Sequence, residues 1–309
     1  MLLAAVNGLR DQVEASRLPL ALPDAPAAGK VRLELLQQLD DYVIPRLSSL
    51  DAPLLAVVGG STGAGKSTLV NSIVGMQVTR PGVLRPTTRS PVLVHHPSDE
   101  HWFVDTRVLP GLARVRGGDL AEDPSAVRLV ANDALPAGLA LLDAPDIDSV
   151  VASNRDLAAQ LLSAADLWLF VTTAARYADA VPWTLLRQAS ERGTSVAIIL
   201  DRVPPEAVGE IRDHLTAMLK EQGLALAPLF PIPEVPLGAD GLLGDAEVGR
   251  LKGWLSALAN DARARALVVR HTLSGALDSI DSRIAVLAEA TGEQQAATNA
   301  LARVADAAY

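Results

Sequence analysis

Short apolar runs alternate with segments of helical spacing through the middle of the chain. Apolar runs typical of buried strands lie at 54–58, 92–95, 139–142, 167–171, 196–200 and 228–232. Segments with the spacing of helices lie between several of these runs, at 66–74, 153–164, 181–191 and 206–222. This alternation predicts an α/β fold of three layers, in which helices cover both faces of a mostly parallel sheet. Residues 98–135 fit no such unit and are predicted to form a hairpin-bearing insertion.

Both ends of the chain are helical in pattern. Residues 1–17 and 30–48 predict two helices, separated by a proline-rich segment. The last fifty residues carry an apolar seam with 4-3-4-3 spacing, formed by Leu273, Leu277, Ile280, Ile284 and Leu287. The seam predicts an amphipathic helix that packs on the N-terminal helices, and the alternative is a stalk that signals to a partner.

These patterns divide the chain into three predicted units. They are an N-terminal helical pair at 1–50, a central α/β domain at 51–260 and a C-terminal helical segment at 261–309. The helical pattern runs to Tyr309 without a capping glycine or proline. We therefore expect the natural protein to continue beyond this residue.

Composition and charge exclude several classes of function. The chain has 27 Lys and Arg against 36 Asp and Glu, a net charge of −9, which argues against nucleic acid as a partner. It has no cysteine, so thiolate metal sites and a cysteine nucleophile are excluded. The sequence opens without the features of a signal peptide, and no apolar stretch approaches the length of a membrane span. We expect a cytoplasmic location.

The segment at 54–75 carries the most specific motif of the sequence. It reads Gly60-x4-Gly65-Lys66-Ser67, after an apolar strand and before a helix, which is the pattern of a phosphate-binding P-loop. In such a loop, glycines let backbone N–H groups turn toward phosphate, the lysine reaches the terminal phosphates and the serine hydroxyl binds Mg²⁺. The residues predicted to hold the nucleotide here are Gly60, Ser61, Thr62, Gly63, Ala64, Gly65, Lys66, Ser67 and Thr68.

A second element of the site is an aspartate at the end of a buried strand. Asp143 directly follows the apolar run at 139–142. Beside a P-loop, an aspartate in this position holds the magnesium ion, so we predict that role for Asp143.

The residues around the P-loop resemble the translation-factor-related GTPases, above all their Era-like and dynamin-like branch. The resemblance rests on the stretch from Lys66 to Gly75, on the segment 85–91 before the strand at 92–95, and on Asp143-Ala-Pro-Asp146 in place of the family's DxxG. It covers roughly residues 53–232 and implies a P-loop NTPase (GTPase-like) domain. The family threonine of switch I, which binds magnesium and senses the γ-phosphate, corresponds to Thr88, with Thr87 as the alternative.

This resemblance implies a Mg²⁺-dependent hydrolysis of GTP to GDP and phosphate. Its catalytic residues would be Lys66, Thr88 and Asp143, and its metal ligands Ser67, Thr88 and Asp143. It also implies that helices from both ends of the chain form one helical bundle beside the GTPase-like domain. A homodimer through the switch face and a membrane-associated C-terminal continuation, peripheral to the membrane, are further implications of the family.

Three departures from the family pattern predict slow hydrolysis. Asp146 stands where the family glycine donates its N–H to the γ-phosphate, and Ile147 replaces the glutamine that orients water in Ras-like enzymes. Thr62 stands where dynamins have a catalytic glutamine. Arg85 or Arg89 is a candidate arginine finger, and the alternative is that both are solvated arginines of the switch loop.

The base-reading motif is also altered. The strand at 196–200 leads into Asp201-Arg202-Val-Pro204, where the family has NKxD and its final aspartate pairs with guanine. Proline has no side-chain acceptor, so Asp201 is the candidate acceptor for the base and Arg202 the candidate to stack on it. The resemblance favours guanine nucleotide (GTP/GDP), with ATP or no preference as the alternative.

Two other functions compete with a GTPase. The stretch at 141–150 resembles part of an ABC-type ATPase, but Ala144 replaces the catalytic glutamate of those proteins and no LSGGQ-like signature precedes it. The second competitor is a nucleotide-binding interaction module that changes shape without hydrolysis. The residues Thr62, Asp146 and Ile147 all favour this second reading.

Overall fold

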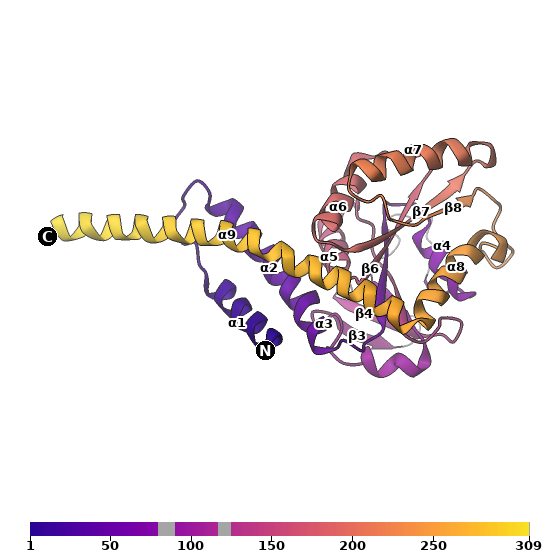
Figure 1. Cartoon of the computed structure of the whole chain (residues 1–309), viewed down its shortest axis with the longest axis horizontal. Helices are drawn as coiled ribbons and strands as arrows, with labels where there is room; N and C mark the ends of the chain where they lie inside the picture. Colours follow the sequence, from indigo (N-terminus) through magenta and orange to yellow (C-terminus); the bar gives the residue numbers. More distant parts are fainter. Residues whose placement is uncertain (80–89, 117–124, 309) are drawn as a thin grey trace.

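A single sheet forms the centre of the protein. The structure, a computed structural model, describes residues 1–79, 90–116 and 125–308. Within these ranges the sheet has eight strands in the order β3-β4-β2-β5-β1-β6-β7-β8 (Figure 1). The strands are β1 (Leu54–Gly60), β2 (Val92–His95), β3 (Ala113–Arg116), β4 (Ala126–Ala131), β5 (Leu139–Asp143), β6 (Leu167–Thr173), β7 (Ser195–Val203) and β8 (Leu229–Pro233). All six apolar runs predicted as strands are strands of this sheet, so the predicted α/β fold is confirmed.

Strand direction divides the sheet into two parts. Strands β5, β1, β6, β7 and β8 are mutually parallel, whereas β2 pairs antiparallel with β5. Strands β4 and β3 then continue parallel to β2 at the edge. The hairpin predicted for 98–135 is therefore wrong, because its two strands run in the same direction. Strand β4 pairs parallel with both β2 and β3, so the three strands share one direction, and the 3₁₀-helix η2 (Pro97–Trp102) and the buried Phe103 lie between β2 and β3.

Helices cover both faces of the sheet, and alternate residues of each strand face the two layers. In β6, Leu167, Leu169 and Val171 pack toward α4 and α8, whereas Trp168 and Phe170 pack toward α5, α6 and α7. These helices are α4 (Lys66–Val74), α5 (Ala152–Ser163), α6 (Ala180–Glu191), α7 (Val208–Glu221) and α8 (Asp245–Asn260). The arrangement is the three-layer architecture of the predicted P-loop NTPase fold.

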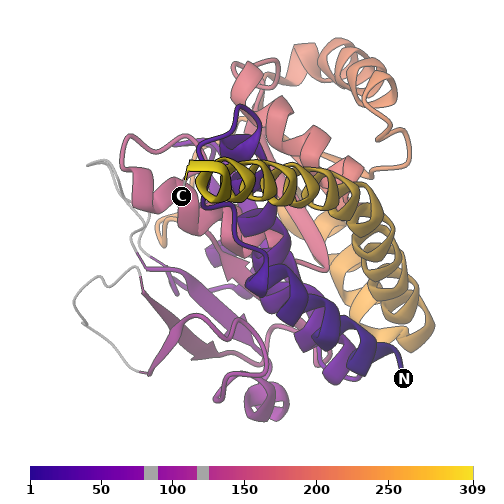
Figure 2. The same ribbon diagram turned by 90° about the vertical axis from the view of Figure 1, so that its left-hand side faces the viewer.

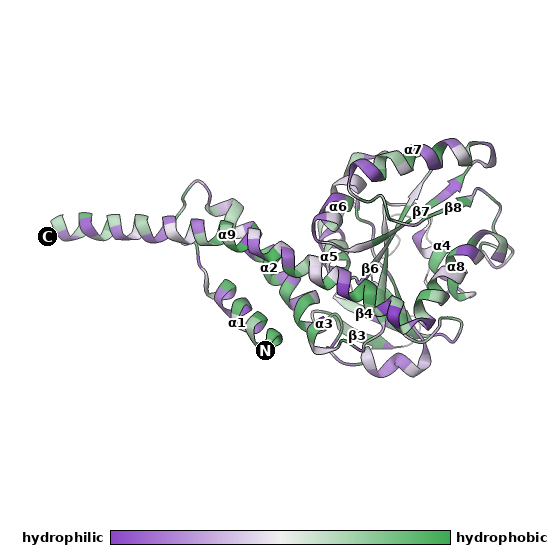
Figure 3. Cartoon of the chain, viewed as in Figure 1, coloured by the Kyte–Doolittle hydropathy of each residue, from purple (hydrophilic) through white to green (hydrophobic). Residues whose placement is uncertain are grey.

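Helices from both ends of the chain lie together beside this sheet (Figures 1 and 2). They are α1 (Leu2–Ala15), α2 (Ala25–Gln38) with its π-helical extension (Leu39–Val43), α3 (Ile44–Ser48) and the 47-residue α9 (Ala262–Ala308). Helix α9 alternates between polar and apolar residues along its length (Figure 3). Its seam residues Ile280 and Leu287 are buried against Leu35 and Leu39 of the N-terminal helices. The predicted helical bundle is thereby confirmed.

Asp166 fastens the bundle to the sheet. It precedes β6 and is buried, and its carboxylate accepts hydrogen bonds from Arg46 at 2.8 Å and from the N–H of Leu55 at 2.8 Å. Its backbone carbonyl accepts from the hydroxyl of Thr272 in α9 at 2.9 Å. Since Asp166 and Leu55 lie at the amino ends of β6 and β1, the bundle is attached at the edge opposite to the P-loop, which follows the carboxyl end of β1.

No helix in the described ranges is both long enough and apolar enough to cross a bilayer.

Candidate functional site

The P-loop connects the carboxyl end of β1 to the first residue of α4, as predicted from the sequence. Gly63 and Gly65 have φ angles of 73° and 97°, in the left-handed region that glycine adopts without strain. A Cβ atom on Gly60 would lie 2.0 Å from the carbonyl oxygen of Val171, so only glycine fits there. These glycines allow the backbone to turn sharply before α4. At the N-terminus of that helix, N–H groups and the helix dipole favour an anion.

The ammonium group of Lys66 lies folded into this loop. Its side chain is 5% exposed, and Nζ donates to the carbonyl oxygens of Gly60 at 3.0 Å and Ser61 at 3.2 Å. It also donates to the carboxylate of Asp146, itself only 6% exposed. The ammonium thus lies within the P-loop, and its anionic partner is a carboxylate of the same chain.

The predicted metal ligands Ser67 and Asp143 are in direct contact. The Ser67 hydroxyl donates to Oδ2 of Asp143 at 2.7 Å, and the Thr79 hydroxyl donates to the same oxygen at 2.8 Å. Burial raises the pKa of Asp143, and the hydroxyl of Ser67 and the charge of Lys66 oppose that rise only in part. Thr88, the third predicted ligand and switch residue, lies outside the described residues, as do Thr87, Arg85 and Arg89.

The donors at this point fit a magnesium ion. Oδ1 of Asp143 is buried and finds no hydrogen-bond partner among the described residues. A buried carboxylate oxygen without a partner lowers the stability of the fold. A divalent cation that prefers oxygen ligands, such as Mg²⁺, would supply that partner. Ser67 and Asp143 would hold such an ion, which supplies positive charge to the phosphates when bound.

Asn71 holds the chain that leads from α4 toward switch I. Its side-chain oxygen accepts from the N–H groups of Val78 and Thr79 at 2.9 Å each, and its Nδ2 donates to the carbonyl of Thr79 at 2.8 Å. These three bonds fix Thr79 beside Asp143. Asn71 lies within the stretch from Lys66 to Gly75 on which the family resemblance rests, but the sequence did not indicate these contacts.

The segment after Asp143 folds back on the P-loop. Ile147 is buried and its N–H donates to the carbonyl of Gly60 at 3.3 Å. Oδ1 of Asp148 accepts from both the N–H of Thr62, at 2.6 Å, and its hydroxyl, at 2.8 Å. Burial opposes ionisation of Asp148, but the hydrogen bonds of Thr62 and Arg176 outweigh it and lower its pKa. The carboxylates of Asp146 and Asp148 therefore accept hydrogen bonds from Lys66 and Thr62 of the P-loop.

The residues predicted to read the base also lie beside the P-loop. Asp201 is buried near the end of β7, and a Cβ on Gly65 would lie 2.4 Å from its Oδ2. Arg202 has a φ of 53°, rare outside glycine, and its guanidinium donates to the carbonyl of Gly63. Burial raises the pKa of Asp201, against the opposing charge of Arg202. The structure thus brings Asp201 and Arg202 to the loop, and their contact with a base stays a prediction.

The sequence analysis missed three residues of this site: Thr79, Asp148 and Arg176. Arg176 follows β6 and donates to Asp148 at 2.9 Å and to the carbonyl of Thr62 at 3.1 Å. It lies 114 positions from Thr62 in the sequence, and no motif surrounds it. The sequence offered one signal: Arg176 follows the carboxyl end of β6, a strand parallel and adjacent to β1, and such ends lie near the P-loop.

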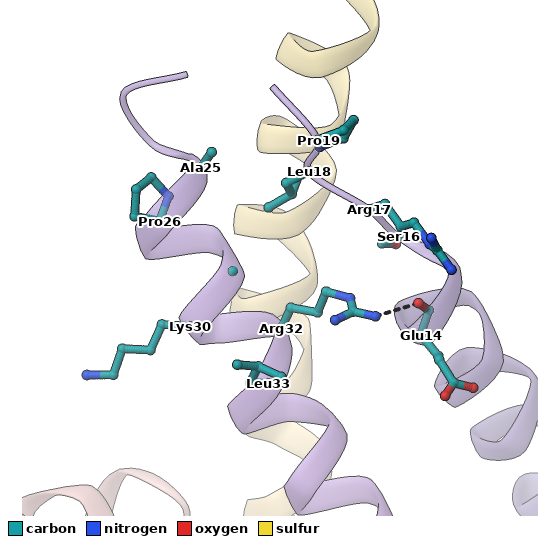
Figure 4. Close-up of a pocket in the computed structure, with 11 residues that line it drawn as sticks. Glu14, Ser16, Arg17, Leu18, Pro19, Ala25, Pro26, Lys30, Arg32 and Leu33 are labelled. Carbon is teal, nitrogen blue, oxygen red and sulfur yellow. Dashed lines mark hydrogen bonds between the residues drawn. The ribbon is translucent and has the colours of Figure 1, made fainter. Parts of the chain in front are cut away.

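A separate hollow lies in the helical bundle, away from the P-loop. It has a volume of about 830 Å³ and opens between the end of α1 and the start of α2 (Figure 4). Its lining includes Arg17, Lys30 and Arg32, and Arg32 donates to backbone carbonyls of Val13 and Glu14.

In the part of the chain that the structure covers, no group of three or more His and acidic side chains lies close enough to hold a metal ion.

No protein-family model matches the sequence, and no curated protein sequence matches it. Among solved structures, Era in complex with MgGDPNP and a segment of 16S ribosomal RNA is 19% identical, with a TM-score of 0.42, and the match covers 66% of this chain and 56% of that chain. A protein of an oligomerised bacterial dynamin pair is 12% identical, with a TM-score of 0.49, and the match covers 92% of this chain and 49% of that chain. Toc33 from Arabidopsis thaliana, in complex with Mg²⁺ and GMPPNP, is 12% identical, with a TM-score of 0.39 and coverage of 75% and 92%. The chain spans about half the length of the first two structures.

Proposed function

We propose that this chain is a Mg²⁺-dependent GTP-binding protein that hydrolyses GTP slowly to GDP and phosphate. The observation that carries the proposal is the P-loop, in which a buried Lys66 and the Ser67–Asp143 pair stand at the N-terminus of α4. A lysine, a hydroxyl and a strand-end aspartate in this arrangement are the parts that bind a nucleoside triphosphate with magnesium. Lys66, Thr88 and Asp143 are the proposed catalytic residues.

Slow hydrolysis is proposed because, among the residues that the structure describes, no side chain beside the P-loop is suited to orient water. Ile147 is apolar and buried, and the N–H and the hydroxyl of Thr62 both donate to Asp148. The same contacts favour a second candidate function, an interaction module that binds nucleotide and changes shape without hydrolysis. Phosphate release separates the two candidates, since only the enzyme turns over.

The choice of nucleotide is tested by calorimetry with GTP, GDP, ATP and ADP in the presence of Mg²⁺. We expect GTP and GDP to bind at least about tenfold more tightly than ATP and ADP, because the carboxylate of Asp201 can accept from guanine N–H groups and would repel the acceptor N1 of adenine. The GTP sample, followed for phosphate release, is expected to turn over slowly. Equal affinities for GTP and ATP would contradict the guanine preference, and absence of binding by all four would contradict the proposal.

A nucleotide-dependent dimer through the switch face is the proposed output of the switch, on the family resemblance of the P-loop and switch I. The carboxylates of Asp146 and Asp148 accept hydrogen bonds from Lys66 and Thr62 of the P-loop, and a bound triphosphate would displace them. Sedimentation velocity is expected to detect a dimer with a non-hydrolysable GTP analogue and a monomer with GDP. Identical monomer profiles with both nucleotides would contradict it. Cytoplasmic location, peripheral to a membrane, is part of the same proposal.

A further inference from the structure

Arg176 lies over the P-loop, held by three contacts. Its Nε donates to Asp179 of the same turn at 2.8 Å, one Nη donates to Oδ2 of Asp148 at 2.9 Å, and the other Nη donates to the carbonyl of Thr62 at 3.1 Å. The turn itself is closed by backbone hydrogen bonds from the N–H of Arg176 to Thr173 and from the N–H of Asp179 to Arg176, both at 3.0 Å. The guanidinium is therefore oriented from its own turn, immediately after β6.

The partner that Arg176 shares with the P-loop is an anion. One oxygen of Asp148 accepts from the N–H of Thr62, and the other oxygen accepts from Arg176. Thr62 is at the centre of the P-loop, whose N–H groups bind phosphate oxygens in proteins with this motif. The carboxylate of Asp148 thus stands where a phosphate group would, and it contacts a P-loop amide and an arginine at once.

We propose that Arg176 binds the γ-phosphate of the nucleotide in place of Asp148. A phosphate offers more acceptor oxygens and more negative charge than a carboxylate, and a planar guanidinium suits two of those oxygens together. Arg176 comes from the same chain, so it needs no second subunit to reach the loop. This inference rests on the proposed function and deepens it by naming the residue that distinguishes a triphosphate from a diphosphate.

The same contact gives Arg176 a role in hydrolysis. Water adds to Pγ while the bond from Pγ to the β–γ bridging oxygen breaks, and the electron pair of that bond stays on GDP. Inorganic phosphate forms, and a proton of the water is released. Negative charge on the γ-phosphate oxygens and the bridging oxygen is stabilised by a guanidinium held within hydrogen-bond reach, as an arginine finger does.

The test compares the affinities for GDP and a non-hydrolysable GTP analogue in Arg176→Ala, Arg176→Lys and the wild type. If ATP proves to be the preferred nucleotide, ADP and an ATP analogue replace them. We expect Arg176→Ala to lose about tenfold or more of affinity for the triphosphate analogue and to keep its affinity for the diphosphate. Its single-turnover hydrolysis should fall by about 10³-fold, and Arg176→Lys should retain part of both.

The matched control is Arg187→Ala, an exposed arginine on the next helix, α6, whose guanidinium bonds only to the hydroxyl of Thr184 among the described residues. It should leave both affinities unchanged. An unchanged triphosphate-to-diphosphate ratio in Arg176→Ala, or an equal loss for both nucleotides, would overturn the role of Arg176 while leaving nucleotide binding intact. A wild type that binds no nucleotide would overturn the proposed function instead, before any variant is measured.

Discussion

Replacement of Lys66 by alanine is expected to abolish measurable nucleotide binding, with a loss of affinity of about 10³-fold. Lys66 is 5% exposed, and its ammonium donates to the carbonyls of Gly60 and Ser61, so the P-loop itself fixes the position of the charge. Removing one partner of a buried, hydrogen-bonded charge pair costs about 2–5 kcal/mol in binding. Calorimetric titration of the preferred nucleotide with Mg²⁺ measures the loss.

Lys220→Ala is the matched control for this variant, because Lys220 is an exposed lysine of α7, far along the chain from the P-loop. It should bind nucleotide as the wild type does. Thermal unfolding of both variants without nucleotide checks that the fold persists. A folded Lys66→Ala protein with unchanged affinity would mean that the loop is not the phosphate site.

The parts of the site that depend on local sequence were predictable. The P-loop is eight consecutive residues, and its function follows from glycine at fixed positions and the lysine that succeeds them. Asp143 could be placed because the apolar run before it identifies a buried strand, and parallel strands end at one edge of a sheet. The strands themselves were found because their burial leaves continuous apolar runs of β-branched and leucine residues.

The parts that depend on distant contacts were not predictable. Asp148 bonds to Thr62 across 86 positions and Arg176 to Thr62 across 114, and neither residue sits in a pattern that identifies its partner. The edge strands β3 and β4 were misjudged for a related reason. Two short strands in succession are typical of a hairpin, but here the parallel pairing of β4 with β2 decides their direction.

The helical bundle was predictable only in part. Its seam was visible in α9 as apolar residues at heptad spacing, while its attachment to the sheet was not. That attachment depends on Asp166, which is tied to Arg46 and, through its carbonyl, to Thr272. It also depends on Gly193 and Gly275, whose backbones come so close that a Cβ on either would lie under 3 Å from the other. In the sequence, this close contact is marked only by two glycines that no motif surrounds, so it could not be predicted.

The acidic segment after Asp143 gives the second large prediction: Asp146→Asn should tighten nucleotide binding by about ten- to hundredfold. The carboxylate of Asp146 pairs with Lys66, and both side chains are less than 10% exposed. A phosphate that binds Lys66 must break this ion pair, and the negatively charged carboxylate of Asp146 then repels it. Asparagine keeps the volume and removes the charge, so both costs fall.

The same substitution should lower the stability of the nucleotide-free protein, because it leaves the Lys66 ammonium buried without its anionic partner. Thermal unfolding and calorimetry together therefore test the idea more sharply than either alone. Asp51→Asn, at an exposed aspartate before β1, serves as the control and should change neither quantity. A variant that loses stability and also binds nucleotide more weakly would contradict the prediction. A lower melting temperature with tighter binding would mean that Asp146 competes with phosphate for Lys66, and that the departure from the family glycine makes the empty site more stable at the expense of affinity.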